Sequence, residues 1–356
     1  MRKAKVISIV GARPQFVKLG PLSKEIRKIF QEVIIHTGQH SDIEMSTNFF
    51  NDLDIPQPDF NLNISGGSHG VQTAQMMIGL ENLLKQLSPD LLIIYGDTNS
   101  TVAGSLVCAK LGIKSIHVES GLRSFNRLMP EEINRVVADH LSDYLFVPTE
   151  TAMNNLVSEG LTQKSYFTGD IMVDSLKMAI QKSLQLGIPQ KITLPTGKFY
   201  LCTLHRPYNV DDPIKLQKIL SLLGELEHTI IFPVHPRTRK MMAENSMKVP
   251  NNFILMNPLG YFEFVYLQST ALKIITDSGG VQKEAYMLQK PCITLRTETE
   301  WIETVEAGWN LLLNPDTSID LAHRIDSFVP QKPNQPLFGE GVASKMVTII
   351  TEILNN

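Results

Sequence analysis

Short β-rich runs and helical patterns alternate along this chain, and this alternation constrains the fold more than any other feature. Apolar runs of strand length occupy residues 5–10, 91–95 and 113–118, whereas the apolar side chains of residues 71–87 recur at helical spacing. Alternating β and α elements of this kind require a parallel sheet with helices on both faces. The first half of the chain therefore predicts a doubly wound α/β domain.

The alternation stops after Gly169 and restarts beyond a proline-containing segment, residues 187–198, which indicates a linker. We predict an α/β protein with two doubly wound, Rossmann-like domains, 1–169 and 170–356, that face a cleft. The length of the chain, too great for one ordinary core, agrees with two domains. A final helix, roughly residues 340–354, is expected to pack on either domain, the N-terminal one included.

Composition and charge are those of an ordinary globular protein. Apolar residues make up 43% and charged residues 19%, and the formal net charge is −3. This charge argues against a nucleic-acid partner, so a local cluster must hold any anionic ligand. Cys108, Cys202 and Cys292 lie in apolar runs without metal-site spacing, which predicts reduced core thiols and a cytoplasmic protein. The apolar runs have strand length, so no membrane span is expected.

Carboxylates lie where two predicted strands end. Asp97 closes the run 91–97, and Glu119 closes the run 113–119. Because the carboxyl ends of parallel strands form the ligand crevice, both acids are expected to point into one cavity. Glu131 follows a proline near the start of a predicted helix. Three acids near one crevice favour proton transfer over anion binding alone.

These acids also have a purely structural interpretation. Asp97 lies at a strand-to-helix turn and is equally expected as the N-cap of the helix that follows. Glu131 and Glu132 are typical first-turn acids, which interact favourably with the helix dipole. Glu119 is harder to explain in this way, because no apolar-periodic helix starts directly after it.

Basic side chains follow other predicted strands. Arg13 comes just after the first strand, with Lys18 a little further on, and His205, Arg206 and His235 follow two strands of the second half. Three strands that end in His or Arg are more than we expect if basic residues follow core strands only by chance. No His, Glu or Cys spacing resembles a metal site, and no GxSxG elbow is present.

The segment 274–285 combines a strand end, glycines and a helix start. Ser278, Gly279 and Gly280 permit close backbone approach, and the helix that begins there offers unpaired N–H groups to an anion. The turn predicts a phosphate or diphosphate seat, although paired glycines also suit tight packing. Glu284, one turn further on, could accept hydrogen bonds from ribose hydroxyls or belong to a solvated face. The segment is neither a Walker A loop nor a GxGxxG fingerprint.

Eight ordered blocks, spread over nearly the whole chain, carry a family resemblance: GARPQFVKLGPL (11–22), TGQH (37–40), YGDTNSTVAG (95–104), HVESGLR (117–123), MPEEINR (129–135), TLHRPYN (203–209), FPVHPR (232–237) and TDSGGVQKEA (276–285). Together they resemble the non-hydrolysing UDP-N-acetylglucosamine 2-epimerases, which have the two-domain glycosyltransferase B fold. That family converts UDP-N-acetylglucosamine to UDP-N-acetylmannosamine by anti elimination of UDP to a 2-acetamidoglucal, followed by re-addition. The C2 hydrogen has no adjacent carbonyl to acidify it, so its removal must accompany departure of a stabilised UDP.

The resemblance implies roles for the residues at matching positions. It assigns the catalytic groups to Asp97, Glu119, Glu131 and His205. It assigns the contacts with the UDP-sugar to Arg13, Lys18, Arg135, His235, Ser278, Gly279, Gly280, Glu284 and Arg296. A candidate allosteric segment falls on Gln39 and His40. We expect a homodimer that needs no metal and no organic cofactor.

The chain departs from the commonest family pattern in several segments. Gln15 stands where many members have Glu, and residues 300–303 read Glu-Trp-Ile-Glu where many have Arg-Pro-Glu after Thr-Thr-Glu. With segments 66–70 and 121–126, these differences are more similar to a subgroup that acts on modified UDP-sugars, notably UDP-2,3-diacetamido-glucuronate. The alternatives are therefore that substrate, a glycosyltransferase of the same fold, a hydrolysing relative, or a UDP-sugar sensor. The carboxylate trio argues against the transferase and the sensor.

Overall fold

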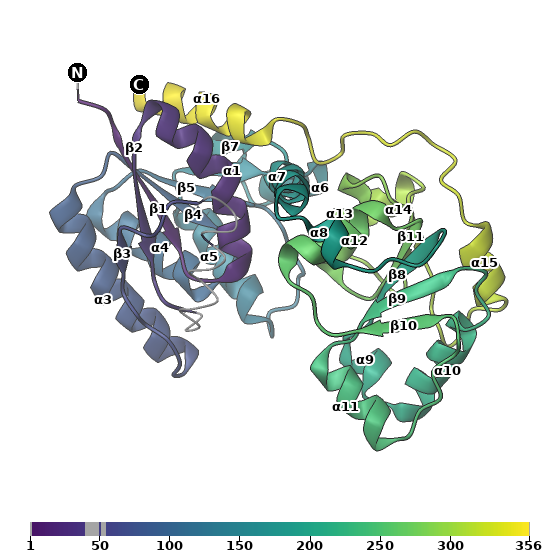
Figure 1. Cartoon of the computed structure of the whole chain (residues 1–356). Helices are drawn as coiled ribbons and strands as arrows, with labels where there is room; N and C mark the ends of the chain where they lie inside the picture. Colours follow the sequence, from purple (N-terminus) through teal and green to yellow (C-terminus); the bar gives the residue numbers. More distant parts are fainter. Residues whose placement is uncertain (1, 40–49, 51–54, 356) are drawn as a thin grey trace. The chain divides into compact units, whose positions relative to one another are not determined.

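The computed structural model describes residues 2–39, 50 and 55–355. By its internal contacts the chain divides into an N-terminal unit, residues 1–178 with 337–356, and a C-terminal unit, residues 179–336. Each unit is built around a parallel sheet packed with helices (Figure 1).

The N-terminal unit contains a parallel sheet whose strands, in the described part of the chain, follow the order β3-β2-β1-β4-β5-β6-β7. Its elements are β1 (Lys5–Val10), α1 (Arg13–Ile29), β2 (Gln31–His36), β3 (Phe60–Asn61), α3 (His69–Leu87), β4 (Leu91–Tyr95), α4 (Asn99–Leu111), β5 (Ser115–Val118), α5 (Pro130–Leu141), β6 (Tyr144–Val147), α6 (Glu150–Ser158), the 3-10 helix η1 (Thr162–Lys164), β7 (Ser165–Phe167) and α16 (Val342–Asn355). The helix α7 (Met172–Gln185) runs across the unit boundary.

The C-terminal unit repeats this topology with the described strands in the order β10-β9-β8-β11-β12-β13, again all parallel. Its elements are α8 (Ile188–Lys191), β8 (Phe199–Thr203), α9 (Pro207–Val210), α10 (Pro213–Leu223), β9 (Thr229–Pro233), α11 (Pro236–Glu244), β10 (Phe253–Met256), α12 (Tyr261–Thr270), β11 (Lys273–Thr276), α13 (Gly279–Met287), β12 (Cys292–Thr294), α14 (Ile302–Glu306), β13 (Asn310–Leu312) and α15 (Leu321–Ser327). Both orders follow the 3-2-1-4-5-6 succession of a Rossmann sheet.

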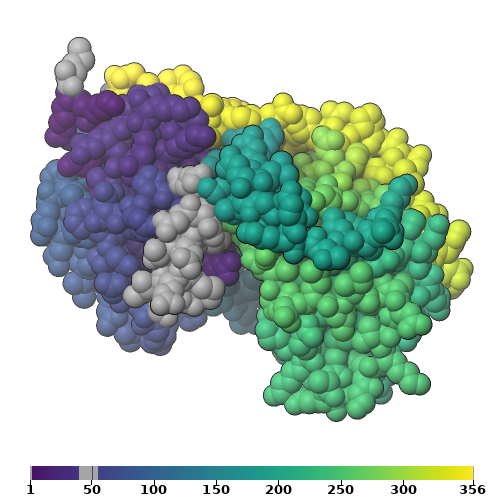
Figure 2. Space-filling model, in the orientation of Figure 1, coloured from purple at the N-terminus to yellow at the C-terminus, as the bar shows by residue number. Residues whose placement is uncertain are grey.

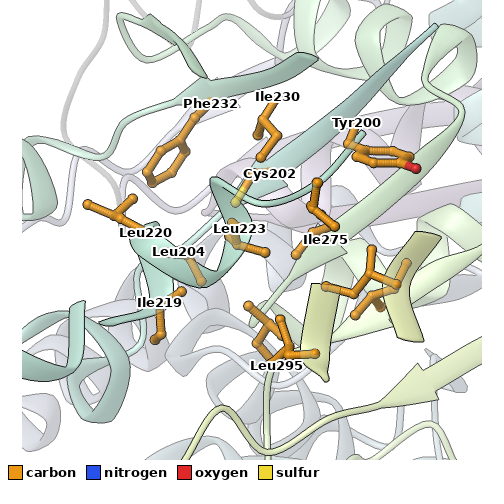
Figure 3. Close-up of a cluster of buried hydrophobic side chains, with 14 of the residues drawn as sticks. Tyr200, Cys202, Leu204, Ile219, Leu220, Leu223, Ile230, Phe232, Ile275 and Leu295 are labelled. Atoms are coloured by element: carbon orange, nitrogen blue, oxygen red, sulfur yellow. The ribbon is translucent and has the colours of Figure 1, made fainter. Parts of the chain in front are cut away.

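Strands in the centre of each sheet are covered on both faces. All five residues of β4 are buried, as expected for a parallel strand between two helical layers. In β1, Ile7 and Ile9 belong to the core formed with α3 and α4. In the C-terminal unit, Cys202, Phe232 and Ile275 from three strands pack with side chains of α10 (Figure 3). This packing holds the strand ends, and the loops that follow them, in place.

The unit boundary lies between Met178 and Ala179, inside α7, rather than after Gly169 as the sequence suggested. The first turns of α7 are tied to the N-terminal unit, because Ser175 Oγ donates to the Val17 carbonyl at 2.8 Å. The proline-containing segment therefore lies wholly within the C-terminal unit.

The final helix, α16, belongs to the N-terminal unit and contacts α1. Figures 1 and 2 show the yellow α16 beside the purple α1. Its buried apolar side chains Val342, Met346, Ile350 and Ile353 recur at helical spacing and form the packed face.

The strands expected at residues 5–10 and 91–95 are confirmed as β1 and β4, and the run 113–118 contains β5. The edge strands β3 and β7 were not predicted, because two or three residues leave no readable periodicity.

No helix in the described residues is long and apolar enough to cross a membrane. Cys108 and Cys292 are free, and burial raises the pKa of each thiol to about 12.

Candidate functional site

In each sheet the strand order reverses between two neighbouring strands, β1 and β4 in one unit and β8 and β11 in the other. Ligands of doubly wound sheets bind at the carboxyl ends of the strands at such a switch point. Arg13 and Asp97 follow β1 and β4, and His205 and Ser278 follow β8 and β11. The structure therefore places these four sequence-predicted residues at the switch points of the two sheets.

Asp97 and Glu119 leave the carboxyl ends of adjacent parallel strands, which pair in register up to the last residue of each strand. Each acid forms an ion pair: Glu119 Oε2 with Lys18 Nζ, and Asp97 Oδ2 with Arg135 Nη2. The Lys18–Glu119 pair is nearly buried, with side chains 10% and 12% exposed. Two carboxylates and two cations thus share one end of the sheet.

Asp97 is not the N-cap of α4, so that alternative interpretation is wrong. The helix begins at Asn99, and the cap is Thr98, whose Oγ1 accepts from the Thr101 N–H at 3.4 Å. The Asp97 carboxylate is thereby left to pair with Arg135. On the backbone side, the Asp97 carbonyl accepts from Asn134 Nδ2 at 3.0 Å.

Glu119 has left-handed backbone geometry, with φ of 72°. For a residue other than glycine this costs about 1–3 kcal/mol and is typical of functional sites. An added Cβ on Gly96, in the neighbouring turn, would lie 3.4 Å from Lys18 Nζ and 3.5 Å from Glu119 Oε2. The backbone of the β4 turn therefore packs directly against the ion pair.

The two acids of α5 have different environments. Glu131 is exposed in the first turn of the helix. Glu132 is buried and accepts hydrogen bonds from the Ser124 N–H at 2.8 Å, the Ser124 hydroxyl at 2.9 Å and the Phe125 N–H at 2.9 Å. Glu132 therefore holds the loop that precedes the helix, a role that the sequence did not predict.

Gln15 joins the loop after β1 to the turn after β4. Its Oε1 accepts from the N–H groups of Gly11 at 2.7 Å and Ala12 at 3.1 Å. Its Nε2 lies 2.8 Å from the Tyr95 carbonyl and 2.9 Å from Thr98 Oγ1. The side chain is buried, and it connects the loop that carries Arg13 with the turn that carries Asp97. The sequence singled out Gln15 as a departure from the family without indicating this bridge.

The other predicted residues of this unit are Arg13 in the first turn of α1 and the candidate allosteric residues Gln39 and His40. Arg13 is exposed at the first position of α1. Gln39 Oε1 accepts from the Ser100 N–H at 3.1 Å and the Ser100 hydroxyl at 2.8 Å, so it contacts α4 three residues after Asp97. His40 lies outside the described residues.

His205 is oriented by a carboxylate that the sequence analysis did not select. Its Nδ1 lies 3.1 Å from Oδ1 of Asp277, which is fully buried at the end of β11. Asp277 also accepts from the N–H groups of His205 at 3.1 Å and Arg206 at 3.0 Å. A carboxylate at Nδ1 favours a hydrogen there and leaves Nε2 available for proton transfer. The signal for Asp277 was its place beside Ser278 in the glycine-containing turn.

The N-terminus of α13 accommodates a carboxylate. An added Cβ on Gly279 would lie 1.8 Å from Oε1 of Glu300, whereas one on Gly280 meets no described atom within 4 Å. Glu300 Oε2 accepts from Arg296 Nη1 at 2.7 Å. An anionic group thus lies against the glycine that begins the helix, where the helix dipole favours negative charge.

Glu284 and His235, two further predicted residues of this unit, each accept a hydrogen bond from a neighbouring residue. Glu284 Oε2 accepts from Nε2 of the buried Gln268 at 2.8 Å. His235 is exposed and is the N-cap of α11, with Nδ1 accepting from the Arg237 N–H at 3.3 Å. Across the described ranges of the chain, no group of three or more His, Cys, Asp and Glu side chains is placed to hold a metal ion.

A family model for UDP-N-acetylglucosamine 2-epimerase matches residues 24–352. The chain belongs to this family. It is 49% identical to a UDP-N-acetylglucosamine 2-epimerase homolog of Methanococcus maripaludis, over 99% of both chains. It is 41% identical to the UDP-2,3-diacetamido-2,3-dideoxy-D-glucuronate 2-epimerase of Pseudomonas aeruginosa, over 96% of this chain and 98% of the relative. The structure of the Methanocaldococcus jannaschii UDP-GlcNAc 2-epimerase in complex with UDP-GlcNAc and UDP matches with a TM-score of 0.82 and 40% identity, over 98% of this chain and 99% of that chain.

Membership of this epimerase family confirms the predicted enzyme class, an isomerase, and the predicted fold. The two Rossmann-like sheets are those of the glycosyltransferase B fold.

Proposed function

We propose that this epimerase inverts C2 of UDP-N-acetylglucosamine and gives UDP-N-acetylmannosamine, by anti elimination and re-addition of UDP. A base removes the C2 proton while the C1–O bond breaks, and UDP leaves with the bonding electrons. The C1–C2 double bond of a 2-acetamidoglucal forms. A proton then adds to the opposite face of C2, and a UDP oxygen bonds again to C1. These reaction steps balance without an oxidant. The reaction needs a proton-transfer group on each face of the sugar ring.

The observation that carries this proposal is the pair of acids at adjacent strand ends, each ion-paired with a basic side chain. Lys18 pairs with Glu119 and Arg135 pairs with Asp97, so the negative charge of each acid faces a cation. Arg135 Nη1 also lies 3.3 Å from Glu132 Oε2. Together with Glu131, Asp97 and Glu119 are proposed to serve the two proton transfers.

For the C-terminal unit we propose that His205 transfers a proton and that the turn at the start of α13 binds UDP. The Asp277 contact with Nδ1 supports the role of His205. The carboxylate of Glu300 beside Gly279 supports an anion seat there. The other proposed contacts with the UDP-sugar are Arg13, Lys18, Arg135, His235, Ser278, Gly280, Glu284 and Arg296.

Epimerisation in D2O tests the reaction. Elimination through a removed C2 proton must place deuterium at C2 of the product, which proton NMR detects. The protein should turn over after exhaustive treatment with EDTA and without added nucleotide cofactor. Product that retains protium at C2 would refute the proton-transfer mechanism.

Amide variants test the acids. Asp97→Asn, Glu119→Gln and Glu131→Gln each keep side-chain size and should lower kcat about 10²–10⁴-fold. Glu150→Gln is a matched control for Glu131, because Glu150 is also an exposed acid in the first turn of a helix. We expect the control to keep native kcat. Native kcat in all three test variants would remove the basis of the assignment.

A second candidate substrate is UDP-2,3-diacetamido-glucuronate. It is favoured by Gln15 and segment 300–303, and it is the substrate named for the Pseudomonas aeruginosa relative, which is 41% identical. Comparison of kcat/KM for the two UDP-sugars decides between them. Incubation with UDP-sugar and an acceptor sugar tests the glycosyltransferase alternative, which requires a new glycosidic product.

We further propose that the enzyme acts in the cytoplasm, as a homodimer, in polysaccharide biosynthesis. The free, buried cysteines support a reducing compartment, and the exposed Val71 and Ile78 of α3 offer apolar surface for association. Light scattering should give twice the mass of the chain.

The contact of Gln39 with Ser100 supports an effect of the candidate allosteric segment on the Asp97 turn. Gln39→Ala should then change the dependence of rate on UDP-sugar concentration.

A further inference from the structure

A buried charge network joins the turns that carry Asp97 and Glu119. At its centre is His117, a fully buried residue of β5. Its Nδ1 lies 2.7 Å from Oδ1 of Asp139, and its Nε2 lies 2.6 Å from the carbonyl oxygen of Gly96. Both are hydrogen-bond distances, so each ring nitrogen has a partner.

Both ring nitrogens of His117 must donate. A backbone carbonyl can only accept, so Nε2 carries a hydrogen. Asp139 Oδ2 accepts from the Gly121 N–H at 3.0 Å and from Arg123 Nη1 at 2.7 Å. Hydrogen bonds and a cation of this kind favour an ionised carboxylate, which then accepts from Nδ1 as well. An imidazole with hydrogens on both nitrogens is the imidazolium cation.

The charges around His117 alternate in sign. Burial acts to raise the pKa of Asp139, but its contacts with His117 and Arg123 outweigh burial and hold that pKa below the ordinary value. Arg123 also pairs with Glu159 through two hydrogen bonds of 2.7 Å. Two cations and two anions therefore form one connected network.

Two further titratable groups face this network from neighbouring elements. His140 Nδ1 lies 4.0 Å from Oε2 of Glu159, and Lys164 Nζ donates to the Asp139 carbonyl at 2.8 Å. Burying so many charges is expensive, and well-packed apolar residues would often be at least as stable. Stability alone therefore does not account for the network.

We propose that His117 is a positioning residue that donates from both ring nitrogens and so sets the geometry between the Asp97 and Glu119 carboxylates. Gly96, its acceptor, directly precedes Asp97, and Gly121, held by the same Asp139 carboxylate, lies two residues after Glu119. One rigid network thus holds both turns. The inference rests on the catalytic roles proposed for these two acids.

Two amide substitutions separate the two hydrogen bonds of His117. In His117→Gln the amide N–H has about the reach of Nε2 and can still donate to Gly96. In His117→Asn it has about the reach of Nδ1 and can donate to Asp139 only. Both variants lose the charge, so they are matched controls for each other.

The proposal requires the two variants to differ in kcat. A displacement of about 1 Å can cost about 10²-fold in rate, so His117→Asn should lower kcat about 10- to 100-fold. His117→Gln should stay within a few-fold of native kcat. UDP affinity should be native in both, since the proposed UDP seat is in the C-terminal unit. Equal kcat values in two variants of equal stability would overturn the proposal, because a merely structural role affects both alike.

Nitrogen-15 NMR of the native enzyme tests the protonation state without any substitution. Both ring nitrogens of His117 should carry hydrogens in the folded enzyme, because each lies at hydrogen-bond distance from an acceptor. A single ring N–H in the folded enzyme would overturn the proposal, even if neither variant folds. Failure of the proposed function is a separate result: native kcat in Asp97→Asn would refute the role of Asp97, whatever the ring nitrogens show.

Discussion

Replacing Gln15 by Met removes the bridge between the loop after β1 and the turn after β4 while keeping the length of the side chain. Gln15 is 1% exposed, so water cannot take over its hydrogen bonds. The N–H groups of Gly11 and Ala12, bound at 2.7 and 3.1 Å, lose their acceptor. The Tyr95 carbonyl, in contrast, still accepts from Thr101 Oγ1 at 2.7 Å.

The expected cost follows from these two orphaned donors. Each buried, unsatisfied group costs about 1–3 kcal/mol, so Gln15→Met should lower the free energy of unfolding by about 2–6 kcal/mol. Folded domains are stable by about 5–15 kcal/mol, so the loss is a large fraction of the total. Gln15→Glu keeps an acceptor for both N–H groups, and its second oxygen can accept from the Thr98 hydroxyl. It loses the hydrogen bond to the Tyr95 carbonyl, which Thr101 Oγ1 still satisfies. It should cost much less.

Urea denaturation of native protein and both variants measures this difference, and kcat reports on the Asp97 turn. We expect the order of stability native, Gln15→Glu, Gln15→Met, and a lower kcat for Gln15→Met at temperatures where it is folded. Equal destabilisation by Glu and Met would refute the reasoning, because it would mean that the acceptor role of Gln15 contributes nothing.

Three further predictions concern other contacts. Asp277→Asn removes the charge that orients His205, so kcat should fall about 10²–10⁴-fold with little change in UDP affinity by calorimetry; a purely raised KM would contradict this role. Gly279→Ala must displace the neighbouring carboxylate and should raise KM for the UDP-sugar in steady-state kinetics, whereas Gly280→Ala, with open space around it, should not. A hydrogen bond from the backbone of β1, and then a nearby guanidinium, hold the pKa of Asp90 below its ordinary value. The resulting stability is present above the unfolded pKa of about 3.9 and is lost as pH falls through the lower folded pKa. Asp90→Asn should therefore be less stable than native near neutral pH, by at most about 1 kcal/mol, and urea titrations should show the difference shrinking below about pH 4.

Structural features that depend on one short segment of the chain could be predicted from the sequence. The apolar run before Asp97 and the glycines after Ser278 each specify a strand end by local pattern, and the topology of parallel strands then gives the position of the loop. The start of α4 was uncertain between two interpretations of Asp97, and only the cap geometry of Thr98 decided it. The unit boundary was misplaced because the chain crosses it inside the continuous helix α7, with no break in composition.

The partners of the candidate site residues could not be predicted in this way. Lys18 and Glu119 are 101 residues apart in the chain, and Arg135 and Asp97 are 38 apart. No periodicity links such positions. The bridge made by Gln15 likewise spans about 80 residues and depends on β1 and β4 being neighbours in the sheet.

By itself, the sequence determined the succession of strands and helices, and with it the two doubly wound sheets and the loops that carry the acids and the glycine turn. This follows because the burial pattern of each strand and helix is a local property of the chain. The tertiary structure alone decided which cation pairs with which acid, the left-handed conformation of Glu119, and the two acceptors that lie beside the ring nitrogens of His117. These depend on strand order and register, which bring distant segments to within a hydrogen bond of one another, and no local pattern records that distance.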